Sequence, residues 1–166
     1  MHISLKDIDA FVFDFDGVLT DNLVHIDQNG NEFVSCSRAD GLAFDVLRKL
    51  NQAVFILSTE KNSVVAARAK KLRVPAIQGV KNKSRSIKEL VDSHGFKLDR
   101  VLYVGNDLND FNAIKLCGFS ACPADSHSKI LAETDFVLKT SGGEGVVREL
   151  LEDVLGLDFL KIMFDK

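Results

Sequence analysis

The chain has 166 residues, 46% of them hydrophobic, and its 24 acidic and 21 basic residues give a net charge of −3. This length and composition predict one globular domain over residues 1–166, and the lack of a basic excess argues against nucleic acid as a partner. The longest apolar run, AVFIL at 53–57, is far shorter than the roughly 20 residues that span a bilayer. Since the first ten residues also lack the apolar core of a signal peptide, we expect a cytoplasmic protein without a membrane partner.

Short apolar runs alternate with helical patterns along the chain. The segments between the runs repeat apolar residues every three or four positions, which is typical of helices. This alternation predicts an α/β fold, a doubly wound parallel sheet with helices on both faces. The six expected strands are residues 10–14, 53–57, 74–78, 101–105, 118–122 and 135–139.

The alternation is interrupted between the first strand and a helix expected to begin near Ala39. Residues 22–36 alternate apolar and polar side chains on both sides of the sequence QNGN. The pair Asn29-Gly30 is favoured in two-residue hairpin turns, because both positions tolerate positive φ. We therefore expect a projecting β-hairpin at residues 22–36.

Polar side chains follow the expected strands at one edge of the sheet, where ligands bind in doubly wound folds. They are Asp14 and Asp16 after the first strand, Ser58, Thr59 and Glu60 after the second, Lys83 at the start of the helix that follows the third, and Asn106, Asp107 and Asp110 after the fourth.

Asp14 and Asp16 raise an electrostatic question, because their charges repel. Two unit charges about 4 Å apart cost roughly 4 kcal/mol at an effective dielectric constant of 20. A divalent cation offsets this cost, and carboxylate and amide oxygens suit Mg²⁺, which also binds substrate phosphates. The cluster therefore predicts Mg²⁺ together with an anionic substrate.

These residues also carry a resemblance. DFDGVLTDN at 14–22, Ser58, Lys83 and GNDLND at 105–110 follow the order of the four motifs of the haloacid dehalogenase-like phosphohydrolases. With the hairpin in place of a cap domain, the chain resembles the capless branch that includes 3-deoxy-D-manno-octulosonate 8-phosphate and nonulosonate 9-phosphate phosphatases. The resemblance covers nearly the whole chain and implies the Rossmann-like fold of that family.

The resemblance implies a role for each motif. Asp14 is the expected nucleophile, which forms an aspartyl phosphate, and Asp16 the expected general acid and base. Ser58 and Lys83 are expected to bind the phosphoryl group. Asp14, the backbone carbonyl of Asp16 and Asn106 are the expected Mg²⁺ ligands. Family members often carry Asp in place of Asn106, so Asp107 is a second candidate ligand, and we expect Asp110 to lie outside the ligand set.

The implied substrate is a small phosphorylated sugar acid. Arg68 and Arg148 are candidate partners of its carboxylate. The octulosonate 8-phosphate phosphatases tend to carry arginine where this chain has Glu60, which favours a nine-carbon or acylamino sugar acid. The sequence GGEG at 142–145 either covers the pocket or gives the last helix a flexible start. The full set of expected substrate-binding residues is Ser37, Asp40, Thr59, Glu60, Arg68, Gly143 and Glu144.

A pocket without a cap domain needs another cover. The family resemblance implies a homotetramer in which the hairpins of residues 22–36 meet at the centre and a neighbouring subunit forms part of the pocket wall.

Two alternatives remain open from the sequence. A receiver domain also groups aspartates, a hydroxyl residue and a lysine, although it needs no proton-transfer residue at the position of Asp16. A non-catalytic oligomerisation module of the same branch would explain Asn106, whereas the presence of Asp14, Asp16 and Lys83 together argues against it.

Overall fold

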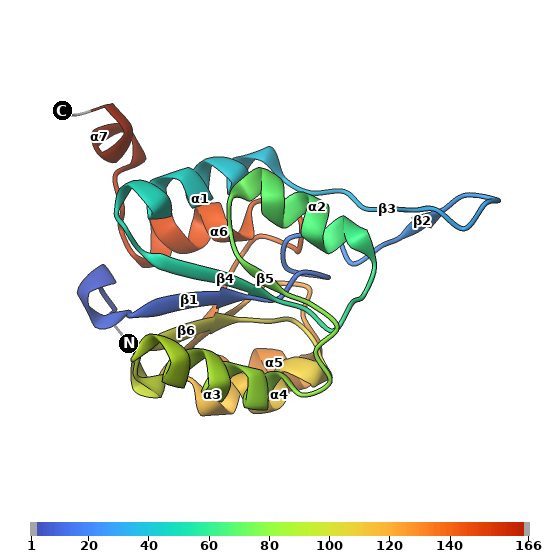
Figure 1. Cartoon of the computed structure of the whole chain (residues 1–166). Helices are drawn as coiled ribbons and strands as arrows, with labels where there is room; N and C mark the ends of the chain where they lie inside the picture. Colours follow the sequence, from blue (N-terminus) through green and yellow to red (C-terminus); the bar gives the residue numbers. More distant parts are fainter. Residues whose placement is uncertain (1–2, 165–166) are drawn as a thin grey trace.

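A computed structural model describes residues 3–164 and contains one six-stranded sheet (Figure 1). All neighbouring strands are parallel, in the order β5-β4-β1-β6-β7-β8. The strands are β1 (Ala10–Phe13), β4 (Ala53–Leu57), β5 (Ala76–Ile77), β6 (Val101–Val104), β7 (Phe119–Cys122) and β8 (Phe136–Val137). Each of the six predicted strands is therefore confirmed, and the α/β doubly wound class with them.

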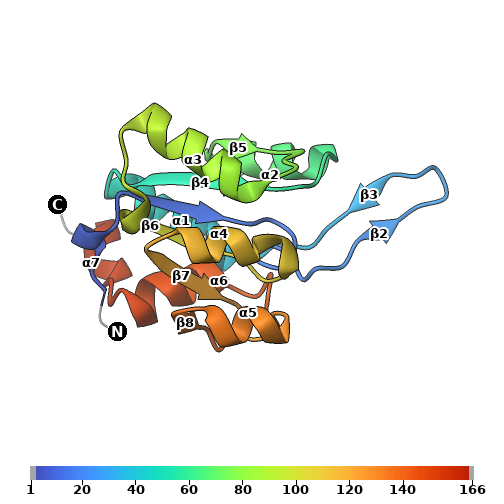
Figure 2. The same ribbon diagram turned by 90° about the horizontal axis from the view of Figure 1, so that it is seen from below.

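Helices cover both faces of the sheet, as predicted (Figures 1 and 2). One face carries α1 (Arg38–Lys49), α2 (Ser63–Leu72) and α6 (Val146–Glu149), and the other carries α3 (Lys83–His94), α4 (Phe111–Leu116) and α5 (Ser128–Glu133). A π-helical turn (Leu150–Val154) extends α6, and α7 (Phe159–Phe164) packs against α1. Short 3₁₀ turns lie at Leu5–Asp7, Leu98–Arg100 and Leu108–Asp110.

Alternate residues of β1 supply two hydrophobic cores. Phe11 and Phe13 belong to the core under α1 and α6, where the ring of Phe13 meets Phe44 of α1 edge-on with centroids 5.4 Å apart. Val12 belongs to the core under α3 and α4. Because side chains alternate along a strand, a continuous apolar run is what a strand buried on both faces requires.

The topology fixes where a ligand can bind. From β1 the chain adds β4 and β5 on one side and then crosses to add β6, β7 and β8 on the other. The crossover leaves a crevice between the carboxyl ends of β1 and β6, which is where doubly wound folds bind ligands. The loops after these two strands carry Asp14, Asp16, Asn106 and Asp107.

The predicted hairpin is present but its turn is not of the predicted type. Strands β2 (His25–Ile26) and β3 (Glu32–Phe33) pair antiparallel and project from the sheet (Figure 2). The N–H of Gly30 donates to the carbonyl of Asp27, the N–H of Asp27 donates to the carbonyl of Asn31, and Gly30 has φ 80°. This is a three-residue loop with a left-handed glycine, so the predicted two-residue turn is wrong. The Asp27 carboxylate favours the longer loop, because it accepts the N–H groups of Asn29 and Asn31.

Among residues 3–164, no helix has the length and apolar character that crossing a membrane requires.

Candidate active site

A cavity of about 360 Å³ opens at the carboxyl ends of β1 and β6. Five of the predicted site residues line this cavity, which we call the catalytic pocket. They are Asp14, Asp16, Thr59, Asn106 and Asp107. The prediction that strand-end side chains meet at one rim therefore holds for these five.

Asp14 belongs to a buried charge cluster. Its Oδ1 lies 2.8 Å from Nζ of Lys83, and the same ammonium lies 2.6 Å from Oδ1 of Asp110. All three side chains are at most 5% exposed. Lys83 starts α3, whose N-cap Asn82 accepts the N–H of Arg85, so the helix start fixes the lysine beneath β1. Lys83 thus offsets part of the negative charge at Asp14 that we expected a metal ion to offset.

The three charges leave the cluster one negative charge in excess. Burial raises the pKa of Asp14 to about 8, and the nearby charge of Asp110 acts in the same direction, while Lys83 opposes them. Burial lowers the pKa of Lys83, but the charges of Asp14 and Asp110 outweigh it and the net shift is upward. The ammonium is therefore retained, and a cation beside Asp14 would favour the ionised carboxylate.

Asp16 lies in the same pocket but is half-buried. Burial raises the pKa of Asp16, and the charge of Glu60 raises it further. A carboxyl group that holds its proton at a higher pH is suited to donate it to a leaving oxygen. Asp14 and Asp16 thus differ in environment, as two carboxylates with different tasks require.

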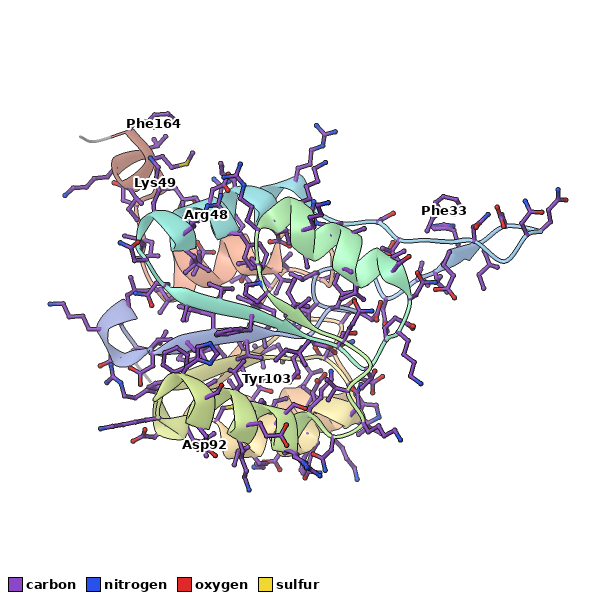
Figure 3. The ribbon with its side chains drawn as sticks, viewed as in Figure 1. Phe33, Arg48, Lys49, Asp92, Tyr103 and Phe164 are labelled. Carbon is purple, nitrogen blue, oxygen red and sulfur yellow. The ribbon has the colours of Figure 1, made fainter. Side chains whose placement is uncertain are left out.

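Asp110 holds the loop after β6 in place. Its Oδ1 accepts the hydroxyl of Tyr103 at 2.6 Å, and its Oδ2 accepts the N–H groups of Asn106 and Asp107 at 2.9 and 3.2 Å. Tyr103 lies in the middle of the sheet (Figure 3). Asp110 does not line the catalytic pocket, and its place outside the ligand set stays a prediction.

Asn106 provides the structural test of a metal site. Its residue is 7% exposed, and its amide oxygen Oδ1 is buried without a hydrogen-bond partner among the described residues. An unsatisfied buried oxygen costs about 1–3 kcal/mol, so a ligand on this atom would be stabilising. A hard cation or its bound water is a suitable one, next to the carboxylates of Asp14 and Asp16 in the same pocket.

The donor set fits Mg²⁺ only if Asn106 takes part. Within residues 3–164, no group of three Asp, Glu, His or Cys side chains is arranged to hold a metal ion. Asp107 is exposed, and its Oδ1 accepts the N–H of Leu108. Asn106 therefore fits the position of a ligand better than Asp107 does.

Ser58 and Glu60 lie beside the catalytic pocket without lining it. Ser58 is 1% exposed, and its hydroxyl accepts the N–H of Glu60. Glu60 accepts the N–H groups of Lys61 and Asn62 before α2, while its charge acts on Asp16.

Three expected substrate-binding residues lie elsewhere. Ser37 caps α1 by accepting the N–H of Ala39, and its carbonyl accepts Nη2 of Arg68 at 2.7 Å. Arg68 lines a separate hollow between α1 and α2. Asp40 is buried under α6, where its Oδ1 accepts the N–H groups of Val147 and Arg148. The structure thus does not bring Ser37, Asp40 and Arg68 to the catalytic pocket.

The glycine-rich segment at 142–145 packs against the loop that follows β1 (residues 14–22), which we call the catalytic loop. Gly142 packs so closely on the carbonyl of Gly17 that a Cβ would overlap it, and the N–H of Gly143 donates to the carbonyl of Val18 at 3.0 Å. Glu144 is exposed, and neither Gly143 nor Glu144 lines the pocket. The nearby Arg148 pairs with Glu152.

Three pocket residues were missed from the sequence: Asn22, Leu108 and Asn109. Leu108 and Asn109 fall within the GNDLND motif, whose spacing could have identified them. Asn22 is the last residue of the first motif, DFDGVLTDN, but its place in the pocket depends on a backbone conformation that no pattern indicated.

The chain matches known proteins over most of its length. The family model described as haloacid dehalogenase-like hydrolase matches residues 48–150. Two curated relatives are 3-deoxy-D-manno-octulosonate 8-phosphate phosphatases. The one from Salmonella typhi is 31% identical over 93% of this chain and 84% of the relative, and the one from Haemophilus influenzae is 30% identical over 99% and 92%.

Solved structures agree with this match. A hydrolase of the same family from Streptomyces avermitilis superposes with a TM-score of 0.92 at 42% identity, covering 96% of this chain and 91% of that one. The phosphatase from Moraxella catarrhalis, solved with magnesium, phosphate and KDO, superposes with a TM-score of 0.87 at 30% identity, covering 91% and 87%. The chain therefore belongs to the haloacid dehalogenase-like hydrolases, as a homologue of the 3-deoxy-D-manno-octulosonate 8-phosphate phosphatases.

Proposed function

We propose that this chain is a Mg²⁺-dependent phosphomonoester hydrolase that acts on a phosphorylated 3-deoxy sugar acid. The observation that carries the proposal is that Asp14 and Asp16 line one pocket while the buried ammonium of Lys83 forms an ion pair with Asp14. Family membership sets the receiver-domain alternative aside. The complete set of Asp14, Asp16 and Lys83 argues against a module without catalysis.

The first step is attack by Asp14 on the phosphorus of the ester. The N–H of Phe15 and the ammonium of Lys83 both contact Oδ1, at 2.7 and 2.8 Å, which orients the carboxylate and leaves Oδ2 clear of these two contacts. As the bond from phosphorus to the sugar oxygen breaks, Asp16 gives its proton to that oxygen. The products are an aspartyl phosphate and the free alcohol.

The second step regenerates the enzyme. Water attacks the phosphorus of the aspartyl phosphate and gives a proton to Asp16, so that inorganic phosphate leaves and Asp14 is again a free carboxylate. Asp14, the carbonyl of Asp16 and the amide oxygen of Asn106 would hold Mg²⁺, which when bound neutralises charge on the transferring phosphoryl group.

The relatives named above are octulosonate 8-phosphate phosphatases, which supports this substrate class. Glu60 favours a variation within this class. Its charge raises the pKa of Asp16, so a negative group acts on the proton donor from beside the pocket. A substrate carboxylate would be repelled there, whereas a hydroxyl or acylamino N–H would be accepted. We therefore favour a nine-carbon or acylamino sugar acid 9-phosphate.

The hairpin supports an oligomer. Leu23, Ile26 and Phe33 are 63%, 65% and 57% exposed, and lone hairpins are marginally stable in water. Phe33 lies on the part of the hairpin that projects from the body of the molecule (Figure 3). We propose that residues 22–36 form the contact of a homotetramer and that a neighbouring subunit completes the pocket wall.

The test is phosphate release from a panel of esters in the presence of Mg²⁺. The panel contains 3-deoxy-D-manno-octulosonate 8-phosphate, a nonulosonate 9-phosphate, glucose 6-phosphate and p-nitrophenyl phosphate. We expect turnover to be fastest with a sugar acid, and Asp14→Asn to abolish it. Asp92→Asn is the matched control, because Asp92 is exposed on α3 (Figure 3). Turnover that survives in Asp14→Asn, or a preference for glucose 6-phosphate, would contradict the proposal.

A further inference from the structure

Asn22 has an unusual backbone conformation. It lies in the loop between β1 and the hairpin with φ 63°, in the left-handed region that only glycine enters without cost. The other non-glycine residues of the described chain with positive φ are Asn51 and Arg73. Both follow the end of a helix, α1 and α2, where a left-handed residue is a common way to stop. Asn22 has no such role.

The backbone around Asn22 is held by hydrogen bonds within the catalytic loop. Its N–H donates to Oγ1 of Thr20 at 3.3 Å, and the same oxygen accepts the N–H of Gly17 at 3.1 Å. Thr20 is fully buried and forms an isolated antiparallel bridge with Cys36 on the return side of the hairpin. The position of Asn22 is therefore fixed relative to Asp16 and Gly17.

The side chain of Asn22 is not used by the fold. Its carboxamide makes no hydrogen bond to the rest of the described chain, yet the residue lines the catalytic pocket with Asp14 and Asp16. Glycine would satisfy the backbone at this position at least as well. What asparagine adds is an amide at the pocket mouth that both donates and accepts hydrogen bonds.

We propose that Asn22 is a specificity-determining residue, whose carboxamide hydrogen-bonds a hydroxyl group of the leaving alcohol. This inference rests on the proposed function, because it says which residue contacts the alcohol part of the proposed substrate. The polar groups deeper in the pocket serve the phosphoryl group and the metal. Asn22 comes from the hairpin side and meets the organic part of the ester, so it favours esters with hydroxyl groups near the phosphate.

The test compares two kinds of ester with the variant Asn22→Gly. The hydroxyl-bearing esters are 3-deoxy-D-manno-octulosonate 8-phosphate, a nonulosonate 9-phosphate and glucose 6-phosphate, and p-nitrophenyl phosphate has no hydroxyl group on its leaving group. We expect kcat/KM for the best hydroxyl-bearing ester to fall about five- to tenfold, the worth of one hydrogen bond. For p-nitrophenyl phosphate we expect no change.

Asn51→Gly is the matched control. It makes the same substitution at a residue with φ 54°, outside the catalytic pocket, so it relieves the same kind of backbone strain. We expect it to leave both esters unchanged, and thermal unfolding should show that both variants fold.

Two results would overturn the role of Asn22 while leaving the proposed hydrolase intact. One is an unchanged kcat/KM for the hydroxyl-bearing ester, and the other is an equal loss on both esters. A wild-type enzyme that hydrolyses none of the three hydroxyl-bearing esters would overturn the proposed substrate class, and the role of Asn22 with it.

Discussion

The side chain of Asn106 occupies the space into which a Cβ at Gly17 would project. The loop after β1 and the loop after β6 thus pack together closely, because Gly17 has no side chain and the amide of Asn106 fills that space. Because Oδ1 of Asn106 is buried without a partner, this contact also fixes the oxygen that we assign to the metal.

Gly17→Ala should therefore abolish activity. Alanine at φ 79° is strained by about 1 kcal/mol or more, and its Cβ would displace Asn106. We expect kcat to fall more than about 100-fold, as a misplaced catalytic group does, measured as phosphate release. Gly95→Ala separates strain from contact, since Gly95 has φ 71° and open space around it. It should lose stability but retain kcat, and equal activity losses in the two variants would contradict the role of the contact.

Asn106→Asp should tighten Mg²⁺ binding. An ionised carboxylate is a stronger ligand for a hard cation than a neutral amide oxygen, so we expect the dissociation constant to fall about tenfold or more, measured by titration calorimetry. Asn109→Asp is the control, because it adds the same charge to the same pocket at another position. If both variants lower the Mg²⁺ dissociation constant equally, the tighter binding comes from the added charge of the pocket and Asn106 is not a ligand.

Lys83→Met should destabilise the fold as well as stop turnover. The lysine is 1% exposed and lies between Asp14 and Asp110, so its loss leaves two buried carboxylates without their cation. Breaking such a cluster costs about 3–5 kcal/mol. Urea unfolding measures the loss, with Arg85→Met as control, because the pair of Arg85 and Glu89 is exposed on α3. The control should unfold like the wild type, and a stable Lys83→Met variant would contradict the assigned charges.

Asp40 should make stability fall as pH rises. Burial raises the pKa of Asp40 to about 6, above its ordinary value of 3.8, so the folded state holds the proton more tightly than the unfolded state. The stabilisation is complete below about pH 4 and is lost as pH rises through about 6, on the order of 3 kcal/mol. Asp40→Asn does not titrate, and it keeps an oxygen that can accept the N–H groups of Val147 and Arg148. Between pH 4 and 7 we expect the free energy of unfolding of the wild type to fall relative to that of Asp40→Asn.

A constant difference between the two proteins over this range would rule out that titration. Asp40→Ala tests the hydrogen bonds themselves. Gly145 precedes α6 without a side chain to cap it, so Asp40→Ala, which lacks the acceptor, should be less stable than Asp40→Asn by about 0.5–2 kcal/mol at every pH.

Ile26→Asp should dissociate the proposed tetramer. A charge in an apolar contact between hairpins is costly, so we expect smaller particles in size-exclusion chromatography and light scattering. Leu160→Asp places the same charge on another exposed apolar residue, on α7, and should leave the assembly unchanged. A wild-type protein that is monomeric at all concentrations would remove the proposal.

The strands and the main site residues could be predicted because local sequence determines them. A buried parallel strand needs a continuous apolar run, and its carboxyl end places Asp14 or Asn106 in the crevice whatever the details of the loops. Asp40 could not be placed this way. Its partners are 107 and 108 residues away, and only the packing of α1 against α6 brings them together. The same holds for Asn22, whose orientation follows from Thr20, and for the hairpin turn, where Asp27 selects a longer loop.

The close fit of Gly142 and Gly143 against residues 17–21 has a consequence for biosynthesis. Asp14 leaves the ribosome well before the segment that supports its loop, and β1 itself pairs with β4 and β6. Contacts between such distant parts of a chain form late. A nascent or truncated chain that lacks residues 142–145 should thus carry the nucleophile without being able to use it.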